Sequence, residues 1–295
     1  MLDARDAARI FSSRELNALA NGDLSLVSKV AGSFFESLQN TFQVRDVFDA
    51  CYEELRKSYK HEYYIKNLIA KKILIGKHSL NTSTLLSEFR AGTNKADCVI
   101  LNGESTCYEI KSEYDDTSRL QNQLESYLKL FDKVNVVTTK SHADKVDKIA
   151  PLSVGIFILS KRDSLTQIRP AITSSNPIDT DMLMASLRKP EYLSIVKELT
   201  GEAPKCANTK IYNECRDILR SADSSTLRRL FCSTLKKTRK NDKDYISALP
   251  SSLLMAGLEY SMSSAVKLRL LERMNTYISK EALCTTRSSR LSDMN

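Results

Sequence analysis

Glycine and proline are scarce in this sequence. Its 295 residues contain 8 glycines and 6 prolines, where an ordinary composition would give about 7% and about 5%. So few turn-forming residues exclude collagen-like and low-complexity chains, and they disfavour an all-β sandwich or barrel with many tight turns. We therefore expect a protein rich in helix.

Long apolar runs are absent as well. No stretch approaches the ~18 apolar residues that a membrane-spanning helix needs. The first ten residues contain acids and no apolar segment of the signal-peptide type, so we expect neither a membrane partner nor a secretory signal. Hydrophobic residues nevertheless make up 42% of the chain, which is enough to bury a core.

Paired cysteines and clustered histidines are also missing. The seven cysteines form no C-x-x-C pair, and the three histidines are scattered along the chain. These spacings argue against a structural zinc site. Unpaired, reduced cysteines are typical of a cytoplasmic protein, and cytoplasmic is the localisation that we predict.

Positive charge is in excess, and most of it lies in one segment. Of the net charge of +8, a net +7 lies between Lys205 and Lys243, where eleven lysines and arginines face four acids. Such a segment favours a polyanion partner, because neutralising phosphates releases counterions. The alternative is a solvated helical face. The candidate nucleic-acid contacts here are Arg228, Arg229, Lys236, Lys237, Arg239 and Lys240.

The spacing of apolar residues predicts the order of helices and strands. A period near 3.6 predicts four helices before residue 76, the last over 62–75, and further helices over 115–131 and 141–149. Alternating or β-branched runs predict strands over 86–90, 96–101, 105–112, 134–139 and 154–159. Beyond a polar linker, the pattern predicts helices over 181–189, 191–199, 212–221, 225–239 and 263–278.

This order predicts an α/β fold with a mixed sheet between helical segments. The expected parts are an N-terminal helical segment (1–45), a mixed α/β domain (46–170), a linker (171–179), a basic, all-helical C-terminal domain (180–283) and a disordered tail (284–295).

Three acids and a lysine fall on neighbouring predicted strands. Glu109 and Lys111 are two residues apart and project to one face of their strand, Asp97 opens the strand before it, and Glu88 lies on the strand before that. Carboxylates and water are the ligands of Mg²⁺, and a nearby lysine can orient an attacking water or balance charge on a pentavalent phosphate. The alternative is a surface salt pair on an edge strand.

This chemistry makes a demand on the hairpin turn at Asn102-Gly103. A two-residue loop would place Asp97 opposite Tyr108, and Glu109 would face the other side of the sheet. A three-residue loop over 102–104 brings Asp97 opposite Glu109 instead. We predict the three-residue loop.

The same residues carry a family resemblance. Glu88, Asp97, eleven intervening residues and then Glu109-Ile110-Lys111 resemble the PD-(D/E)XK motif of restriction-endonuclease-like nucleases, although Ala96 stands where that motif has proline. The run from Arg119 to Gln123, followed by Tyr127, resembles the glutamine-containing helix found after the motif. Residues 46–160 resemble a little-characterised bacterial and phage branch of this superfamily, whose fold is an αβββαβ core.

The resemblance implies a nuclease that depends on Mg²⁺ or Mn²⁺ and favours DNA, in restriction, phage defence or repair. It implies metal ligation by Asp97 and Glu109 with support from Glu88, and a catalytic role for Lys111. Gln123 would orient the site, and Glu62 would be an additional acid.

Plainer interpretations stay open for several of these residues. Glu62 can complement a helix dipole, Gln123 can be solvated, and Arg119 can contact phosphate or pair with Asp115 or Asp116. For the whole protein, the alternative is a non-catalytic nucleic-acid-binding or protein-interaction module with the same fold. A homodimer would suit a nuclease that cuts both strands of a duplex.

Overall fold

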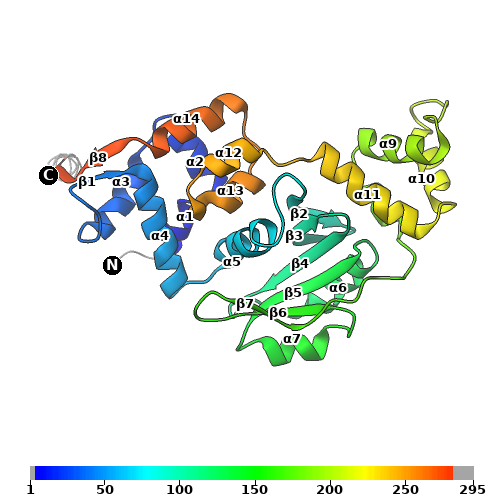
Figure 1. The fold of residues 1–295 in the computed structure, drawn as a ribbon, viewed down its shortest axis with the longest axis horizontal. Helices are drawn as coiled ribbons and strands as arrows, with labels where there is room; N and C mark the ends of the chain where they lie inside the picture. The colour runs from blue at the N-terminus through cyan, green and yellow to red at the C-terminus, as the bar shows by residue number, and fades with distance from the viewer. Residues whose placement is uncertain (1–3, 282–295) are drawn as a thin grey trace. The chain divides into compact units, whose positions relative to one another are not determined.

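The chain forms two compact units. The structure, a computed structural model, describes residues 4–281. Unit 1 combines residues 1–67 with 242–295, and unit 2 consists of residues 68–241 (Figure 1). This division differs from the expected domain borders at 45/46 and 179/180. The tail expected over 284–295 lies outside the described residues.

Unit 1 joins the two ends of the chain. Strand β1 (Thr41–Gln43) pairs antiparallel with β8 (Tyr277–Ser279). Phe11 stacks on Tyr63 with ring centroids 4.6 Å apart and meets Phe48 edge-on at 5.7 Å, which are favourable aromatic geometries. The helical elements of this unit are α1 (Ala4–Arg9), α2 (Ser13–Ala20), α3 (Ser25–Ala31), η1 (Gly32–Phe34), α4 (Val44–Ser58), most of α5 (Glu62–Ile69), α12 (Lys243–Ala248), η3 (Ser251–Leu253), α13 (Leu254–Glu259) and α14 (Ser264–Met274).

Unit 2 is built on a mixed six-stranded sheet. Its strands are β2 (Thr84–Ala91), β3 (Asn94–Leu101), β4 (Ser105–Lys111), β5 (Lys133–Thr139), β6 (Gly155–Leu159) and β7 (Leu165–Arg169), and they lie side by side in chain order. The β2–β3, β3–β4 and β6–β7 pairs are antiparallel, and β4–β5 and β5–β6 are parallel. The chain is therefore a mixed α/β protein, as the sequence predicted.

Helices of unit 2 pack on this sheet and on one another. They are η2 (Ala70–Ile75), which continues α5 as a π-helix, α6 (Leu120–Leu128), α7 (Ala143–Ile149), α8 (Thr180–Ser186), α9 (Lys189–Thr200), α10 (Ile211–Arg220) and α11 (Ser224–Thr238). Val99 and Val134 of the sheet belong to the same buried cluster as Tyr127 of α6 and Phe231 of α11. The order of elements from α5 to β5 is helix, three antiparallel strands, helix, strand.

The expected C-terminal helical domain is divided between the two units. Residues 180–241 belong to unit 2, because apolar side chains such as Leu183, Ile195 and Leu219 join the core of the sheet. The rest, from Asp242 onward, belongs to unit 1. Burial of one continuous apolar core, rather than position along the chain, sets this border.

The polar segment 171–179 has no helix or strand, as expected, but it is docked rather than loose. Ser174 donates its backbone N–H to the carbonyl of Asp132 at 2.8 Å, and Ile178 is buried in the core. The guanidinium of Arg228 donates to Ser174 Oγ at 3.3 Å and to the carbonyl of Asn176 at 3.2 Å. A tether between two domains would not be held in this way.

Several elements differ from the sequence-based expectation. The structure adds β1, β7, β8, α12 and α13, so β6 is not the last strand of the sheet. Helix α6 begins at Leu120, after Asp115 and Asp116. Asp115 accepts hydrogen bonds from the backbone N–H and the hydroxyl of Ser112 at 2.7 and 2.6 Å, and Asp116 accepts one from the backbone N–H of Ser118 at 3.0 Å. Both carboxylates stabilise the turn before the helix.

Across residues 4–281, no helix combines the length and apolar character that crossing a membrane requires.

Candidate active site

The β3–β4 hairpin has the predicted register. Leu101 pairs with Ser105 and Cys98 with Tyr108, so the loop has three residues, and Gly103 adopts φ +76° within it. A left-handed residue at this position is typical of a three-residue hairpin loop. Continued by one residue, the register sets Asp97 opposite Glu109.

Asp97 lies where the two strands stop pairing. Its Oδ2 accepts the backbone N–H of Ile110 at 2.6 Å. This hydrogen bond runs between β3 and β4 just beyond their last ladder pair, and it fixes the Asp97 carboxylate against the end of β4. The predicted proximity of Asp97 to the Glu109-Ile110-Lys111 strand is therefore confirmed.

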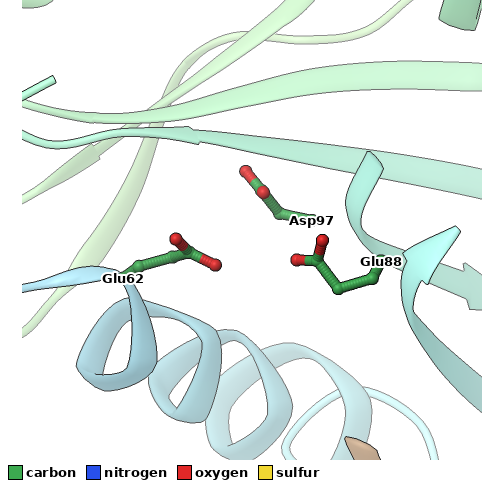
Figure 2. Close-up of side chains that lie close together, drawn as sticks. All are labelled: Glu62, Glu88 and Asp97. Atoms are coloured by element: carbon green, nitrogen blue, oxygen red, sulfur yellow. The ribbon is translucent and has the colours of Figure 1, made fainter. Parts of the chain in front are cut away.

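Glu88 lies opposite Asp97 on the other neighbouring strand. Ser87 pairs with Cys98 and Phe89 with Ala96, and Glu88 between them has φ +52°. An L-residue pays of order 1–3 kcal/mol for this conformation. Glu88 and Asp97 each have a carboxylate oxygen within 4.8 Å of the other, and Figure 2 shows the two side chains close together.

Glu62 is drawn with these two residues in Figure 2. It is the first residue of α5 and belongs to unit 1. Within that unit its carboxylate pairs with the ammonium of Lys66 at 2.6 Å. A catalytic role for Glu62 stays a prediction.

Glu109 is the most enclosed carboxylate of the site. It is 1% exposed. Lys111 donates from Nζ to its Oε1 at 2.8 Å, and the Tyr127 hydroxyl lies 3.0 Å from its Oε2. Burial raises the pKa of Glu109, while Lys111, Tyr127 and Gln123 act in the opposite direction through charge and hydrogen bonds.

Helix α6 contributes two further side chains to the site. Gln123 and Tyr127 are four residues apart, so they lie on one face of the helix. The amide oxygen of Gln123 is buried and has no hydrogen-bond partner within residues 4–281. Burial, together with Glu109, raises the pKa of Tyr127, which keeps its hydroxyl protonated as a hydrogen-bond donor.

Tyr127 lies in the site, although the spacing of apolar residues predicts only that it is buried. By spacing it belongs to the buried stripe of α6 with Leu120 and Leu124. Its hydroxyl also lies 2.6 Å from the carbonyl of Lys95, so it links α6 to β3 beside Glu109. The signal in the sequence is its position four residues after Gln123.

The predicted nucleic-acid contacts separate into buried and exposed groups. Arg228 is 6% exposed and donates to the carbonyl of Leu130 at 3.2 Å. Arg239 binds Glu191 with a shortest N–O distance of 2.6 Å and lies over the ring of Phe89 at 5.3 Å. These two arginines hold the fold together, contrary to the expectation that they grip phosphates.

The remaining cations of that set are at the surface. Lys236 is half-buried, and Arg119, Arg229, Lys237 and Lys240 are exposed. Arg119 lies at the N-cap of α6. The carboxylates of Asp115 and Asp116, its expected alternative partners, accept hydrogen bonds from Ser112 and Ser118 as described above.

Comparison with known proteins places the chain in a family. No solved structure matches it. Protein cII of Enterobacteria phage P4 is 25% identical over 205 residues, which cover 66% of this chain and 75% of that protein. The family described as "Bacteriophage P4 protein cII" matches residues 55–261, which include every strand of the large sheet. The chain therefore belongs to the bacteriophage P4 protein cII family.

Proposed function

We propose that this protein is a metal-dependent nuclease with a restriction-endonuclease-like core. The observation that carries the proposal is the row formed by Glu88, Asp97 and Glu109 across three adjacent strands, with Lys111 bonded to Glu109. The element order from α5 to β5 supports it, because the αβββαβ core of PD-(D/E)XK nucleases has that order.

The donor set suits a hard divalent cation. Asp97 and Glu88 are neighbouring carboxylates, and Glu109 lies on the next strand. Such oxygen donors fit Mg²⁺ or Mn²⁺, and the histidines and cysteines that would select zinc are not part of this row. Once bound there, the metal would supply Lewis-acid activation of a water and of the scissile phosphate.

The residues of the chain have separable roles in phosphodiester hydrolysis. Lys111 lies beside the carboxylates and would orient the attacking water and balance charge on the phosphate. Glu109 holds the Lys111 ammonium in place. The unpartnered amide oxygen of Gln123 can accept a hydrogen bond from that water. DNA is the favoured substrate, from the resemblance of the motif.

Cleavage assays with two site variants test the proposal. Plasmid, linear duplex, single-stranded DNA and RNA are incubated with Mg²⁺ or Mn²⁺, with and without EDTA. We expect cleavage that EDTA abolishes and that Asp97→Asn and Lys111→Ala each lower by at least about 100-fold. Asn keeps an oxygen acceptor for the N–H of Ile110, so this variant is expected to stay folded.

Lys133→Ala is the matched control. Lys133 is a lysine at the other end of the same sheet, paired with Glu104 at 2.6 Å, and its removal is expected to leave the cleavage rate at saturating substrate unchanged. Absence of cleavage on every substrate, with nucleic-acid binding retained, would favour the non-catalytic binding module instead. A loss as large in Lys133→Ala as in Lys111→Ala would reject the assignment of Lys111.

A further inference from the structure

A basic cavity lies within unit 2 at the turn end of the β3–β4 hairpin. Its volume is about 360 Å³, and its lining includes Gly103 of the turn and Thr84 at the start of β2. Thr84 pairs with Leu101. From Leu101 back to Asp97 is four strand residues, or roughly 14 Å at ~3.4 Å per residue. The cavity is therefore separate from the carboxylate row.

Four cations line this cavity, which we call the basic pocket: Arg229, Lys236, Lys237 and Lys240. Its described lining contains no aspartate or glutamate. The hydroxyl-bearing residues Ser83 and Ser233 also line it. Hydrogen-bond donors with a concentrated positive charge are what a phosphate group requires.

The helical period explains why these cations gather. Positions 229, 233, 236 and 237 share one face of α11, since residues three or four apart are neighbours on a helix. The other face carries Leu227, Leu230 and Phe231, which are buried against the sheet. Burying the apolar face turns the basic face outward, over the segment that precedes β2.

Specific bonds hold the two walls of the pocket together. The side chain of Asn241 accepts the backbone N–H of Leu85 at 2.7 Å and donates to the carbonyl of Leu85 at 3.0 Å. Lys236 donates from Nζ to the carbonyl of Thr82 at 2.9 Å. The pocket is thus fixed by the fold before any ligand arrives.

Acids near the pocket leave most of its charge uncompensated. Arg229 lies 3.7 Å from Glu198, but their side chains are 63% and 54% exposed, and such surface pairs contribute little. The negative groups close to Cys232 in the pocket lining are Glu104 and Asp132. Glu104 pairs with Lys133, and Asp132 accepts hydrogen bonds from Ser105.

We infer that the basic pocket binds backbone phosphates of a nucleic-acid strand. This inference rests on the proposed function, since that strand would be the substrate of the carboxylate site. A phosphate in the pocket would hold the strand at a point remote from the scissile bond. Because phosphate contacts carry no base information, the pocket would bind without sequence preference.

The test measures binding without cleavage. Anisotropy titrations of a labelled oligonucleotide, single-stranded or duplex, are run in EDTA over a range of salt concentrations. The full chain is compared with the triple variant Arg229→Gln/Lys237→Gln/Lys240→Gln. We expect affinity at ~0.15 M salt to fall roughly fivefold per cation removed, and the salt slope to fall by about 2 to 3.

A second triple variant, Lys197→Gln/Lys205→Gln/Lys210→Gln, is the matched control. It removes the same charge from exposed positions of unit 2 that do not line the pocket, and it should keep nearly the full affinity and slope. Equal losses in both triple variants, or an unchanged slope in the pocket variant, would overturn the inference.

Inorganic phosphate separates the strand from a small ligand. If free phosphate below 1 mM, on the order of a tight small-ligand site, displaced the oligonucleotide, a phosphorylated small molecule would replace the strand as the ligand. The outcome for catalysis is independent. Pocket-dependent binding without cleavage in any metal would reject the proposed nuclease and support phosphate binding by the basic pocket. Cleavage with an unchanged salt slope in the pocket variant would support the nuclease and reject that role of the pocket.

Discussion

Acidic side chains lie at the open end of the β3–β4 hairpin, and basic side chains lie near its turn. At the open end, Glu109 is 1% exposed and bonded to Lys111 and Tyr127. At the turn end, three cations of the basic pocket lie on the outer face of α11 and the fourth, Lys240, follows that helix. The side chain of Arg229 is 63% exposed. The same sheet thus presents an acidic cluster that is buried at Glu109 and exposed at Glu88, and an exposed basic cluster.

This difference in burial separates two kinds of function. A buried charge must be satisfied by particular bonds, because desolvation is otherwise too costly, and those bonds fix its position. An exposed cation keeps its hydration and acts through charge at a distance. The open end is therefore suited to chemistry at fixed geometry, and the turn end to attracting and holding a polyanion.

The largest expected effect distinguishes the two ends by steady-state kinetics. Asp97→Asn should lower kcat by about 100-fold to 1,000-fold, since it removes an interaction at the reacting phosphate. The pocket triple variant should raise KM and leave kcat within about twofold, since it removes binding that ground and transition state share. Initial rates over a range of substrate concentrations measure both. If the pocket variant lowered kcat as strongly as Asp97→Asn, the assignment of catalysis to the open end and of binding to the turn end would be wrong.

How much of this arrangement the sequence predicts depends on whether the information is local. The Asn102-Gly103 turn, the alternation around it and the demand that Asp97 meet Glu109 were enough to predict the hairpin register, and the structure has it. Turn chemistry and a period of two are local properties, so one sequence contains them.

Long-range features were less predictable. The pairing of β1 with β8 joins residues more than 230 positions apart, and no local sequence pattern predicts it. Arg228 and Arg239 counted as surface charge because a count of cations does not reveal burial. Their carbonyl and carboxylate partners come from distant segments, among them Leu130 and Glu191.

The next largest effect concerns a basic-segment arginine that lies inside the fold. Glu191→Gln leaves the Arg239 guanidinium with a neutral partner, and we expect a loss of about 3 kcal/mol in the free energy of unfolding. Chemical denaturation measures it. Glu198→Gln, on the same helix α9 and paired with exposed Arg229, should cost less than about 0.5 kcal/mol. Equal costs at both positions would mean that burial does not distinguish these arginines.

The same pair makes stability depend on pH. Burial by itself would raise the pKa of Glu191, but hydrogen bonds from Arg239, from the backbone of Arg188 and from Thr238 lower it below 4.5. A carboxylate with a depressed folded-state pKa contributes its full stabilisation above the unfolded value and loses it as pH falls through the folded one. Wild-type stability should thus fall below about pH 4.5 more steeply than that of Glu191→Gln. Parallel curves would contradict this.

A smaller effect is expected at the strained residue of the acidic end. At Glu88, φ +52° favours glycine, so Glu88→Gly should be more stable than Glu88→Ala by about 1 kcal/mol. At exposed Arg90 of the same strand, the order should reverse by about 0.5–1 kcal/mol. Thermal or denaturant unfolding of the four variants measures both differences. Alanine equal to glycine at position 88 would show that the strand is regular there.

The smallest effect belongs to a single cation of the basic pocket. Lys237 lies on the exposed face of α11, so Lys237→Gln should change stability by no more than about 0.5 kcal/mol. For the same variant, the slope of the logarithm of the binding constant against the logarithm of the salt concentration should nevertheless fall by about 0.7 to 0.9, which is the contribution of one phosphate contact. Lys205→Gln is the single-site control, because Lys205 is also exposed and lies outside the pocket. Since the two variants have the same net charge, a difference between their slopes measures position alone. Identical slopes would mean that nucleic acid is attracted by the total charge of the protein and not by the position of Lys237. Of the two ends of the hairpin, only the carboxylate end would then keep a position-specific role.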